Sequence, residues 1–212
     1  MTGVRGKFIT LEGLEGVGKT TNRQTIETQL TLAGIKFVTT REPGGTQAGE
    51  QLRELVLHAK GTMRAETELM LMVASRIELV SQVIEPALSS GQWVLCDRYM
   101  DASIAYQGAG RELGVERVAQ LHELMGIRLQ PDLTVLLDMP VAQGLSRMSL
   151  RGKPDRIERE SLGFFERARD AYLERAHAFP QRIKVIDASR SLEAVSRDVE
   201  QLASSFINAG SR

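Results

Sequence analysis

Eight consecutive residues near the start of the chain have the types and spacing of a phosphate-binding loop. They fit the pattern G-x-x-x-x-G-K-[ST] and are Gly13, Leu14, Glu15, Gly16, Val17, Gly18, Lys19 and Thr20. Glycines in such a loop let backbone N–H groups turn inward around an anion, and the positive end of a following helix points to the same place. Lys19 would add a cation for the outer phosphates of a nucleotide, and Thr20 would offer its hydroxyl to a magnesium ion. The same pattern also fits a glycine-rich turn, so its meaning depends on the flanking elements.

Two further polar segments could contribute to the same chemistry. Residues 41–46 hold an arginine, an acid and two glycines, which suit an anionic ligand but also an ordinary connecting loop. Asp97 is placed to orient magnesium or its waters, and the planar guanidinium of Arg98 could hold a phosphate. The alternative for this pair is a capping aspartate followed by a surface arginine. Ser103 and Gln107, four residues apart, would share one helical face on which an amide could read the edge of a base.

Arg76 stands out because its helical neighbours are apolar. It shares a stripe with four such residues, which are Leu69, Val73, Val80 and Val83. A buried guanidinium needs partners. The spacing leaves two interpretations open, an internal ion pair and a ligand contact in a cleft.

A basic segment lies in the last third of the chain. It contains Arg147, Arg151, Lys153, Arg156 and Arg159, and residues 152 and 154 are a glycine and a proline that interrupt the helical pattern. A flap that carries arginines suits phosphoryl transfer, because an inserted arginine stabilises the charge of the transition state. Acidic residues in the same segment leave a salt-bridged exposed helix as the alternative.

The elements that would position these residues alternate between strand and helix. Five short apolar segments are predicted to be strands, at residues 7–12, 35–40, 93–96, 133–137 and 183–186. Helical patterns lie between them, so we expect an α/β fold with a five-stranded parallel sheet and helices on both faces. The loops that leave the strands then meet at the carboxyl edge of the sheet, where ligands bind. We expect one domain over residues 1–212, a flap at about 147–160, and a frayed tail at 208–212.

Composition narrows the class of protein. Among the 212 residues, 27 are basic and 27 acidic, which gives a net charge of zero where a dedicated nucleic-acid binder shows a basic excess. We therefore expect no nucleic-acid partner. No apolar run approaches the length of a membrane span, and the first residues lack the apolar core of a signal peptide. The single cysteine, Cys96, agrees with a cytoplasmic location.

Taken together, the motifs resemble those of bacterial thymidylate kinases over nearly the whole chain, from about Lys7 to Phe206. Their order and spacing carry the resemblance, since each motif alone is generic. The matching segments are 12–21, 40–46, 97–99 with 103–108, 131–133 and 155–158. The resemblance implies a three-layer P-loop kinase fold, usually homodimeric. It also implies phosphorylation of dTMP to dTDP by ATP with Mg²⁺.

The resemblance also implies roles for individual residues. Lys19 and Thr20 would serve ATP and magnesium, with Asp97 near the metal. Glu15 would face the sugar of dTMP near its 3′-hydroxyl, and Tyr106 would crowd the position of a ribose 2′-hydroxyl. The remaining contacts to dTMP would be phosphate contacts from Arg41 and Arg98, a hydrogen bond from Arg76 to the thymine, and a base pocket lined by Ser103 and Gln107.

Two positions distinguish this chain within the family. Some members carry an arginine inside the phosphate loop where this chain has Gly16, so the flap would supply the catalytic arginine, with Arg151 ahead of Arg147 and Arg156. Met72 stands where members commonly have a phenylalanine that stacks on thymine, and its sulfur could replace that ring. The alternatives are a kinase for another nucleoside monophosphate or for a deoxynucleoside. A more distant one is an NTP-driven switch protein, which the missing Asn-Lys-x-Asp motif disfavours.

Overall fold

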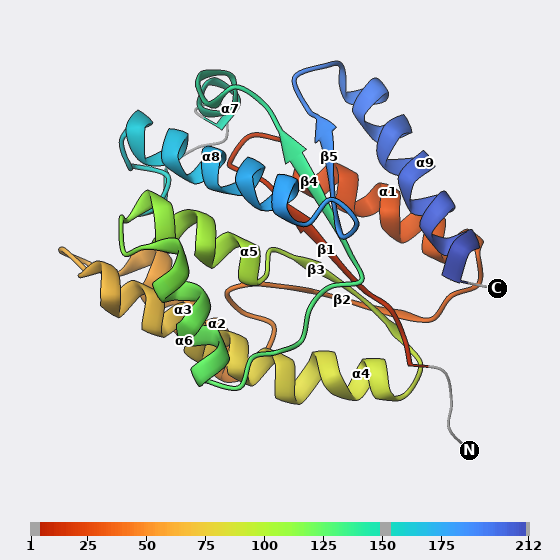
Figure 1. Ribbon diagram of the computed structural model, residues 1–212, viewed down its shortest axis with the longest axis horizontal. Coiled ribbons are helices and arrows are strands. Elements are labelled where there is room, and N and C mark those ends of the chain that lie inside the picture. Colours follow the sequence, from red (N-terminus) through yellow and green to blue (C-terminus); the bar gives the residue numbers. More distant parts are fainter. Residues whose placement is uncertain (1–4, 149–153, 211–212) are drawn as a thin grey trace.

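Five parallel strands form one sheet in the order β2-β3-β1-β4-β5 (Figure 1). The computed structural model describes residues 5–148 and 154–210 of the chain. The strands are β1 (Phe8–Glu12), β2 (Phe37–Arg41), β3 (Trp93–Asp97), β4 (Leu133–Asp138) and β5 (Ile183–Asp187). The expected five-stranded parallel sheet is therefore confirmed. Strand β1 ends at Glu12 as predicted, whereas the other four strands each extend one residue further, so that Arg41 and Asp97 belong to β2 and β3 rather than to the loops that follow.

Helices connect the strands. They are α1 (Lys19–Leu32), α2 (Gln47–His58), α3 (Ala65–Leu79), η1 (Val80–Ile84), α4 (Glu85–Ser89), α5 (Met100–Ser103), η2 (Ile104–Gly110), α6 (Val115–Leu124), α7 (Val141–Met148), α8 (Leu162–Ala178) and α9 (Leu192–Gly210). The two η segments are π-helical, a geometry that often occurs at functional sites. Helix α9 continues through residue 210, and the last two residues of the predicted tail lie outside the described residues.

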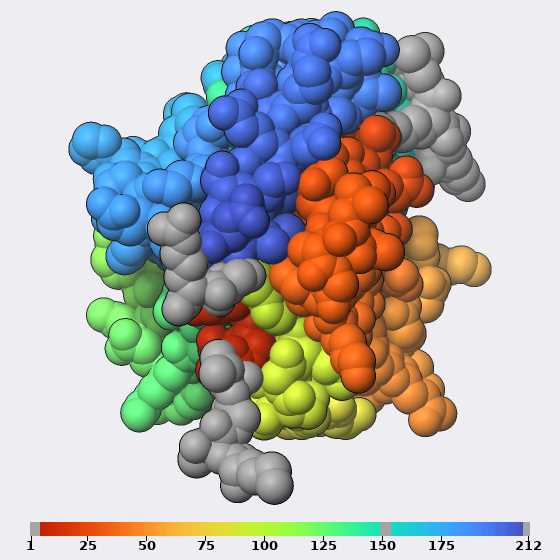
Figure 2. Space-filling model, turned by 90° about the vertical axis from the view of Figure 1, so that its right-hand side faces the viewer, coloured from red at the N-terminus to blue at the C-terminus, as the bar shows by residue number. Residues whose placement is uncertain are grey.

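Both faces of the sheet are covered by helices, which gives three layers. Helices α1 and α9 lie together on one face, and α4, α5 and α8 lie on the other (Figure 1). Figure 2 shows α1 and α9 side by side over the surface of the molecule. The side chains of β1 alternate between the two faces of the sheet, so the strand packs against both helical layers. Ile9 and Leu11 belong to a buried cluster that includes α1, while Phe8 belongs to one that includes α3 and α4.

The order of the strands brings the polar segments to one edge. Strand β1 lies between β3 and β4, with Leu11 aligned with Asp97, and Asp97 is aligned in turn with Arg41 of β2. The loop after β1 and the segment after β3 therefore leave the sheet side by side, at the reversal of strand order where ligands bind in such sheets. Across the described ranges 5–148 and 154–210, no helix has the length and apolar character needed to cross a membrane.

Candidate active site

The glycine-rich loop joins β1 to α1, as the sequence predicts. Gly18 precedes the helix with a φ of 89°, and Lys19 begins it. The Lys19 ammonium folds back over the loop and donates to the carbonyl oxygens of Gly13 at 2.9 Å and of Leu14 at 2.7 Å. Burial, followed by repulsion from Arg98, lowers the pKa of Lys19 to about 8. An anion in the loop would offset both effects.

Gly16 stands at the loop position where, by the resemblance described above, some thymidylate kinases carry an arginine. Its φ is +76°, and a Cβ built there would lie 2.1 Å from the carbonyl oxygen of Gly144 in α7. Both the backbone conformation and the close approach of α7 exclude a side chain. The lack of an arginine in this loop is thus built into the packing.

Arg98 follows β3 in a backbone conformation that side chains rarely adopt. Its φ is 67°. Two hydrogen bonds hold the segment in place, one from the N–H of Arg98 to Leu11 O at 3.0 Å and one from the N–H of Tyr99 to the Glu12 carboxylate at 2.8 Å. Strained backbone of this kind is found where the surroundings fix a functional group.

Glu12, the last residue of β1, is itself unusual because its carboxyl group is fully buried. It also accepts a hydrogen bond from the Tyr172 hydroxyl at 2.7 Å. Burial and the nearby Asp101 raise the pKa of Glu12 to about 8. No feature of the sequence assigns Glu12 a role of its own.

The side chain of Arg98 meets the phosphate-binding loop. Its guanidinium donates to Glu15 at 2.7 Å and to the Tyr106 hydroxyl at 3.1 Å, and that hydroxyl donates to Glu15 at 2.8 Å. These three residues come from the loop after β1, the segment after β3 and η2. The structure thus brings together three of the predicted site residues around one point.

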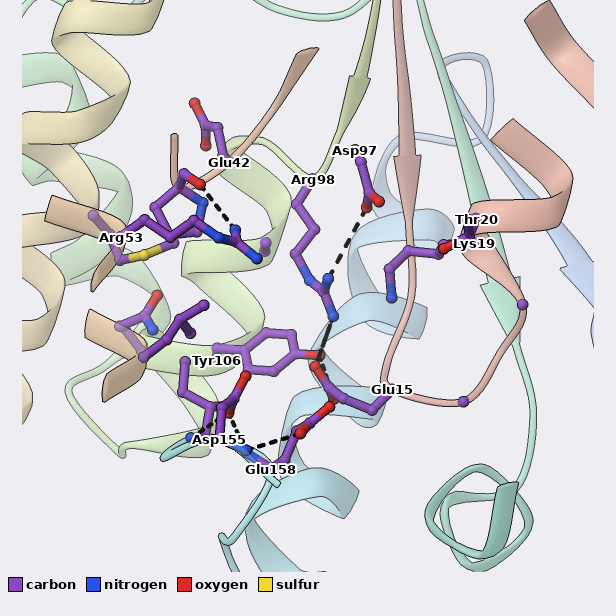
Figure 3. Close-up of a pocket in the computed structure, with 18 residues that line it drawn as sticks. Glu15, Lys19, Thr20, Glu42, Arg53, Asp97, Arg98, Tyr106, Asp155 and Glu158 are labelled. Carbon is purple, nitrogen blue, oxygen red and sulfur yellow. Dashed lines mark hydrogen bonds and ion pairs between the residues drawn. The ribbon is translucent and has the colours of Figure 1, made fainter. Parts of the chain in front are cut away.

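A cleft opens between the phosphate-binding loop, α2 and η2 (Figure 3). Lys19, Arg53 and Arg98 point into it from three different elements. Burial and the positive charges of Arg41 and Arg98 lower the pKa of Arg53. Three cations that repel one another in a partly enclosed space are arranged for a multiply charged anion.

Arg53 was not predicted from the sequence. It lies on the inner side of α2 and is half-buried, with one N–H donated to the carbonyl oxygen of Pro43 at 2.9 Å. A guanidinium has five N–H donors, so most remain available to a ligand. No motif marks the residue, because only the packing of α2 decides which side chain of that helix enters the cleft.

Arg41 does not line the cleft. As the last residue of the edge strand β2 it is exposed, and its guanidinium pairs with Glu50 at 2.9 Å. Arg53, and not Arg41, is the arginine of this region whose side chain lines the cleft. Arg41 ends the edge strand of the sheet, and its guanidinium is held by the Glu50 carboxylate of α2.

Arg76 forms an internal ion pair, which is one of the two interpretations left open by the sequence. It is fully buried, it contacts the Glu42 carboxylate through Nε at 2.8 Å, and it donates to the carbonyl oxygen of Tyr99 at 3.0 Å. Its Nη1 donates to His122, whose pKa is lowered to about 3 by burial and by Arg76, so that the imidazole is neutral. Glu42 reaches the cleft and Arg76 lies behind it.

The predicted base pocket is partly assembled. Met72, Tyr106 and Gln107 line the cleft. The side-chain oxygens of Ser103 and Gln107 are buried without a hydrogen-bond partner. Buried polar atoms of this kind are rare and costly, which indicates that a ligand completes them.

Asp97 and Thr20 both line the cleft beside Lys19. One carboxylate oxygen of Asp97 is buried without a hydrogen bond. Within residues 5–148 and 154–210, no cluster of three or more metal-ligating side chains occurs. A carboxylate and a hydroxyl still fit Mg²⁺, which is commonly held by one or two protein oxygens together with substrate phosphates.

The described part of the basic segment is engaged elsewhere. Arg156 donates to the carbonyl oxygen of Val56 at 2.8 Å and pairs with Glu68 at 2.6 Å. Arg147 donates to the carbonyl oxygen of Ala188 at 3.2 Å. Arg151, the first choice among the flap arginines, lies outside the described residues.

Comparison with known proteins points to one family. The sequence profile described as thymidylate kinase matches residues 11–199. A thymidylate kinase of Pseudomonas putida (strain GB-1) is 52% identical over 198 residues, which cover 93% of this chain and 94% of the relative. A thymidylate kinase of Nitrosospira multiformis is 51% identical, with 93% of this chain and 97% of the relative covered.

A solved structure agrees with the sequence comparisons. The crystal structure of a thymidylate kinase from Ehrlichia chaffeensis superimposes with a TM-score of 0.75 and is 32% identical, covering 93% of this chain and 98% of the other. The similarity extends over the sheet and its helices, so the three-layer architecture expected from the sequence is that of the P-loop kinase fold.

Proposed function

The chain belongs to the thymidylate kinase family, and from that premise we propose how the residues of the cleft carry out its reaction. The enzyme transfers the γ-phosphoryl group of ATP to dTMP, giving dTDP and ADP, with Mg²⁺ as cofactor. This step belongs to dTTP biosynthesis. The observation that carries our assignment of the cleft is the convergence of Lys19, Arg53 and Arg98 at the edge of the sheet.

The phosphate-binding loop holds the donor. Backbone N–H groups of residues 13–20 and the start of α1 would surround the phosphates of ATP. Lys19 would leave its carbonyl partners in the loop and contact the outer phosphates. A hollow on the other side of the loop, lined by Asn22, Arg147 and Arg190 among others, is where the donor nucleoside would extend.

The acceptor occupies the side of the cleft formed by α2, α3 and η2. Arg98 and Arg53 would hold the dTMP phosphate, with Arg53 taking the role that the sequence assigned to Arg41. Glu15 and Tyr106 would face the sugar. These assignments are supported by the shared hydrogen bonds of Arg98, Glu15 and Tyr106 at the meeting point of the two halves of the cleft.

The base would lie against Met72, with Ser103 and Gln107 offering their unpartnered oxygens. Arg76 would orient Glu42, which lines the cleft. The hydrogen bond from Arg76 to thymine, which the family resemblance implies, stays a proposal. Thymine then pairs with buried polar atoms that otherwise lack a partner, which favours the correct ligand strongly.

Catalysis would rest on positioning and on charge neutralisation. An oxygen of the dTMP phosphate attacks the γ-phosphorus in line while the bond to the β-γ bridging oxygen of ATP breaks and ADP leaves. Thr20 and Asp97 would hold Mg²⁺, which neutralises charge on the phosphates when bound. Lys19 stabilises the leaving side, and a flap arginine would cover the transferred group. We keep Arg151 for that role, because Arg156 is occupied by Glu68 and by a carbonyl of α2.

We also propose that the enzyme is a cytoplasmic homodimer. Met70 and Ile77, seven residues apart, share a face of α3 and are exposed by 50% and 38%. An apolar row on a helix surface is typical of a subunit interface. Light scattering after size exclusion would test this: we expect twice the mass of the 23.4 kDa chain, and a monomer at micromolar concentration would contradict it.

A panel of acceptors tests the function. ADP release would be measured with dTMP, dUMP, dCMP, AMP, GMP and thymidine at saturating ATP. We expect dTMP to have the highest kcat/KM. A preference for thymidine would indicate a nucleoside kinase, and ADP release that needs no acceptor would indicate an NTP-driven switch, so either result would contradict the proposal.

A further inference from the structure

Glu68 is a buried glutamate on α3. It does not line the cleft itself but contacts Gln107, which does. It accepts hydrogen bonds from Arg111 at 2.9 Å and from the side-chain amide of Gln107 at 2.8 Å, and it pairs with Arg156 at 2.6 Å. Arg111 is fixed in turn by Glu160 at 2.5 Å. Glu68 is therefore held by several contacts, and its neighbours belong to η2, to the residue directly after η2, and to the described part of the flap.

The surroundings of Glu68 keep it ionised. Burial alone would raise the pKa of its carboxyl group, but hydrogen bonds from Arg111 and Gln107 and the charge of Arg156 lower that pKa below its usual value. An ionised carboxylate accepts hydrogen bonds and donates none. Any side chain placed against Glu68 must therefore present a donor to it.

This requirement decides which way the amide of Gln107 points. The Nε2 group has to face Glu68, so the Oε1 oxygen has to face away from it. That oxygen is buried without a partner, and Gln107 lines the cleft near Met72 and Tyr106. A ligand that reaches this amide would therefore meet a hydrogen-bond acceptor, and the amide could not rotate to offer a donor without breaking its contact with the carboxylate.

We propose that Glu68 is a specificity-determining positioning residue that selects the pyrimidine through Gln107. With Oε1 fixed toward the ligand, the pocket favours a base whose ring N3 carries a hydrogen, as in thymine and uracil. Cytosine presents a lone pair at N3, so two acceptors would face each other in a buried site, which is costly. This inference rests on the proposed function, since it concerns the acceptor base of the same cleft.

Arg111 and Arg156 would by themselves satisfy the charge of Glu68. The third donor is the amide of Gln107, so the carboxylate fixes which end of that amide faces the base pocket. A carboxylate with a purely structural role would make the protein more stable but would not affect which base is accepted.

The experiment compares kcat/KM for dTMP and dCMP in wild type and in Glu68→Gln. In the variant, the new amide can accept or donate, so Gln107 is free to turn. We expect the ratio of dTMP to dCMP to fall by about tenfold or more, the equivalent of one lost hydrogen bond. Glu66→Gln is the matched control, because Glu66 is an exposed glutamate on the same helix. Its ratio should equal that of wild type.

Two further variants keep the test decisive. Glu68→Asp retains the charge but shortens the side chain, so it replaces Glu68→Gln if that variant does not fold, with the same expected fall in the ratio. Gln107→Leu should lower the ratio as well, and adding the Glu68 substitution to it should change the ratio no further.

An unchanged ratio in a folded Glu68 variant would overturn the inference, even if both activities fell together. An additive effect in the double variant would also overturn it, because Glu68 would then act independently of Gln107. These outcomes leave the proposed function intact. Failure of the proposed function would instead be visible in wild type, as a lack of preference for dTMP.

Discussion

Replacing Arg53 tests whether this residue, and not Arg41 as predicted from the sequence, binds the acceptor phosphate. Arg53 and Arg98 point into the cleft, whereas Arg41 pairs with Glu50 outside it. We predict that Arg53→Ala impairs the use of dTMP and that Arg41→Ala does not. Both residues are arginines, and we expect only Arg53 to reach the acceptor phosphate.

The magnitude follows from the contacts. One N–H of Arg53 is used by Pro43, and the remaining donors can reach a phosphate. A hydrogen bond to a charged group contributes about 1.5–3 kcal/mol. The KM for dTMP should therefore rise about 10- to 150-fold in Arg53→Ala. Binding survives because Arg98 remains. Arg41→Ala removes only an exposed ion pair, so we expect a change of no more than about fivefold.

The assay is steady-state kinetics with dTMP varied at saturating ATP, followed by calorimetric titration of dTMP without ATP. The KM for ATP and the melting temperature serve as controls, since neither should change much in either variant. A larger effect of Arg41→Ala than of Arg53→Ala on dTMP binding would refute the reasoning. An equal loss of ATP and dTMP binding in Arg53→Ala would show that Arg53 supports the fold rather than the acceptor.

Three other predictions concern protonation and packing. Because the pKa of Lys19 is lowered to about 8 in the free enzyme and bound phosphates raise it, ATP binding at pH 8.5 should take up part of a proton, while binding at pH 6.5 should take up almost none. Calorimetry in buffers of different ionisation enthalpy measures this uptake, which Lys19→Met should abolish; equal uptake at both pH values would contradict it. Because the pKa of Glu12 is raised from 4.5 to about 8 in the folded state, the folded protein binds the extra proton between these values and loses stability as pH rises through them. The stability of Glu12→Gln relative to wild type should therefore increase by up to about 1.4 kcal/mol per pH unit between pH 5 and 8, and parallel denaturation profiles would disprove this. Gly16→Ala should destabilise the protein by about 1–3 kcal/mol more than Gly34→Ala, since both glycines have positive φ but only Gly16 meets a backbone atom, at 2.1 Å. Equal melting temperatures for the two variants would refute the clash.

Much of the fold could be predicted because it depends on local patterns. The apolar runs and the helical spacing between them predict the sheet and its layers, and the loop at residues 13–20 lies where its motif requires. The ends of the strands were predicted less accurately. Arg41 was predicted to belong to the loop after the second strand, but its pairing with β3 extends the strand to it. The partner of its guanidinium, Glu50, lies on a different element and could not be predicted from the local pattern.

The acceptor side of the site was harder to predict because it depends on contacts between distant segments. Arg53 and Glu68 carry no motif, and their roles depend on how α2 and α3 pack against η2. Arg76 could be singled out from its apolar neighbours, but the spacing could not identify Glu42 and His122 as its partners. A residue's own surroundings in the sequence indicate burial, whereas the partner of a buried charge is decided by tertiary structure.

The transfer of label from ATP tests the central claim most directly. The enzyme would be incubated with Mg²⁺, dTMP and ATP labelled in the γ-phosphoryl group, and the products would be separated by chromatography. We predict that the label appears in dTDP, in amounts equal to the ADP formed, and that little appears as inorganic phosphate. Label found only in inorganic phosphate, or ADP formed at the same rate without dTMP, would contradict the claim that this cleft joins two nucleotides for direct transfer.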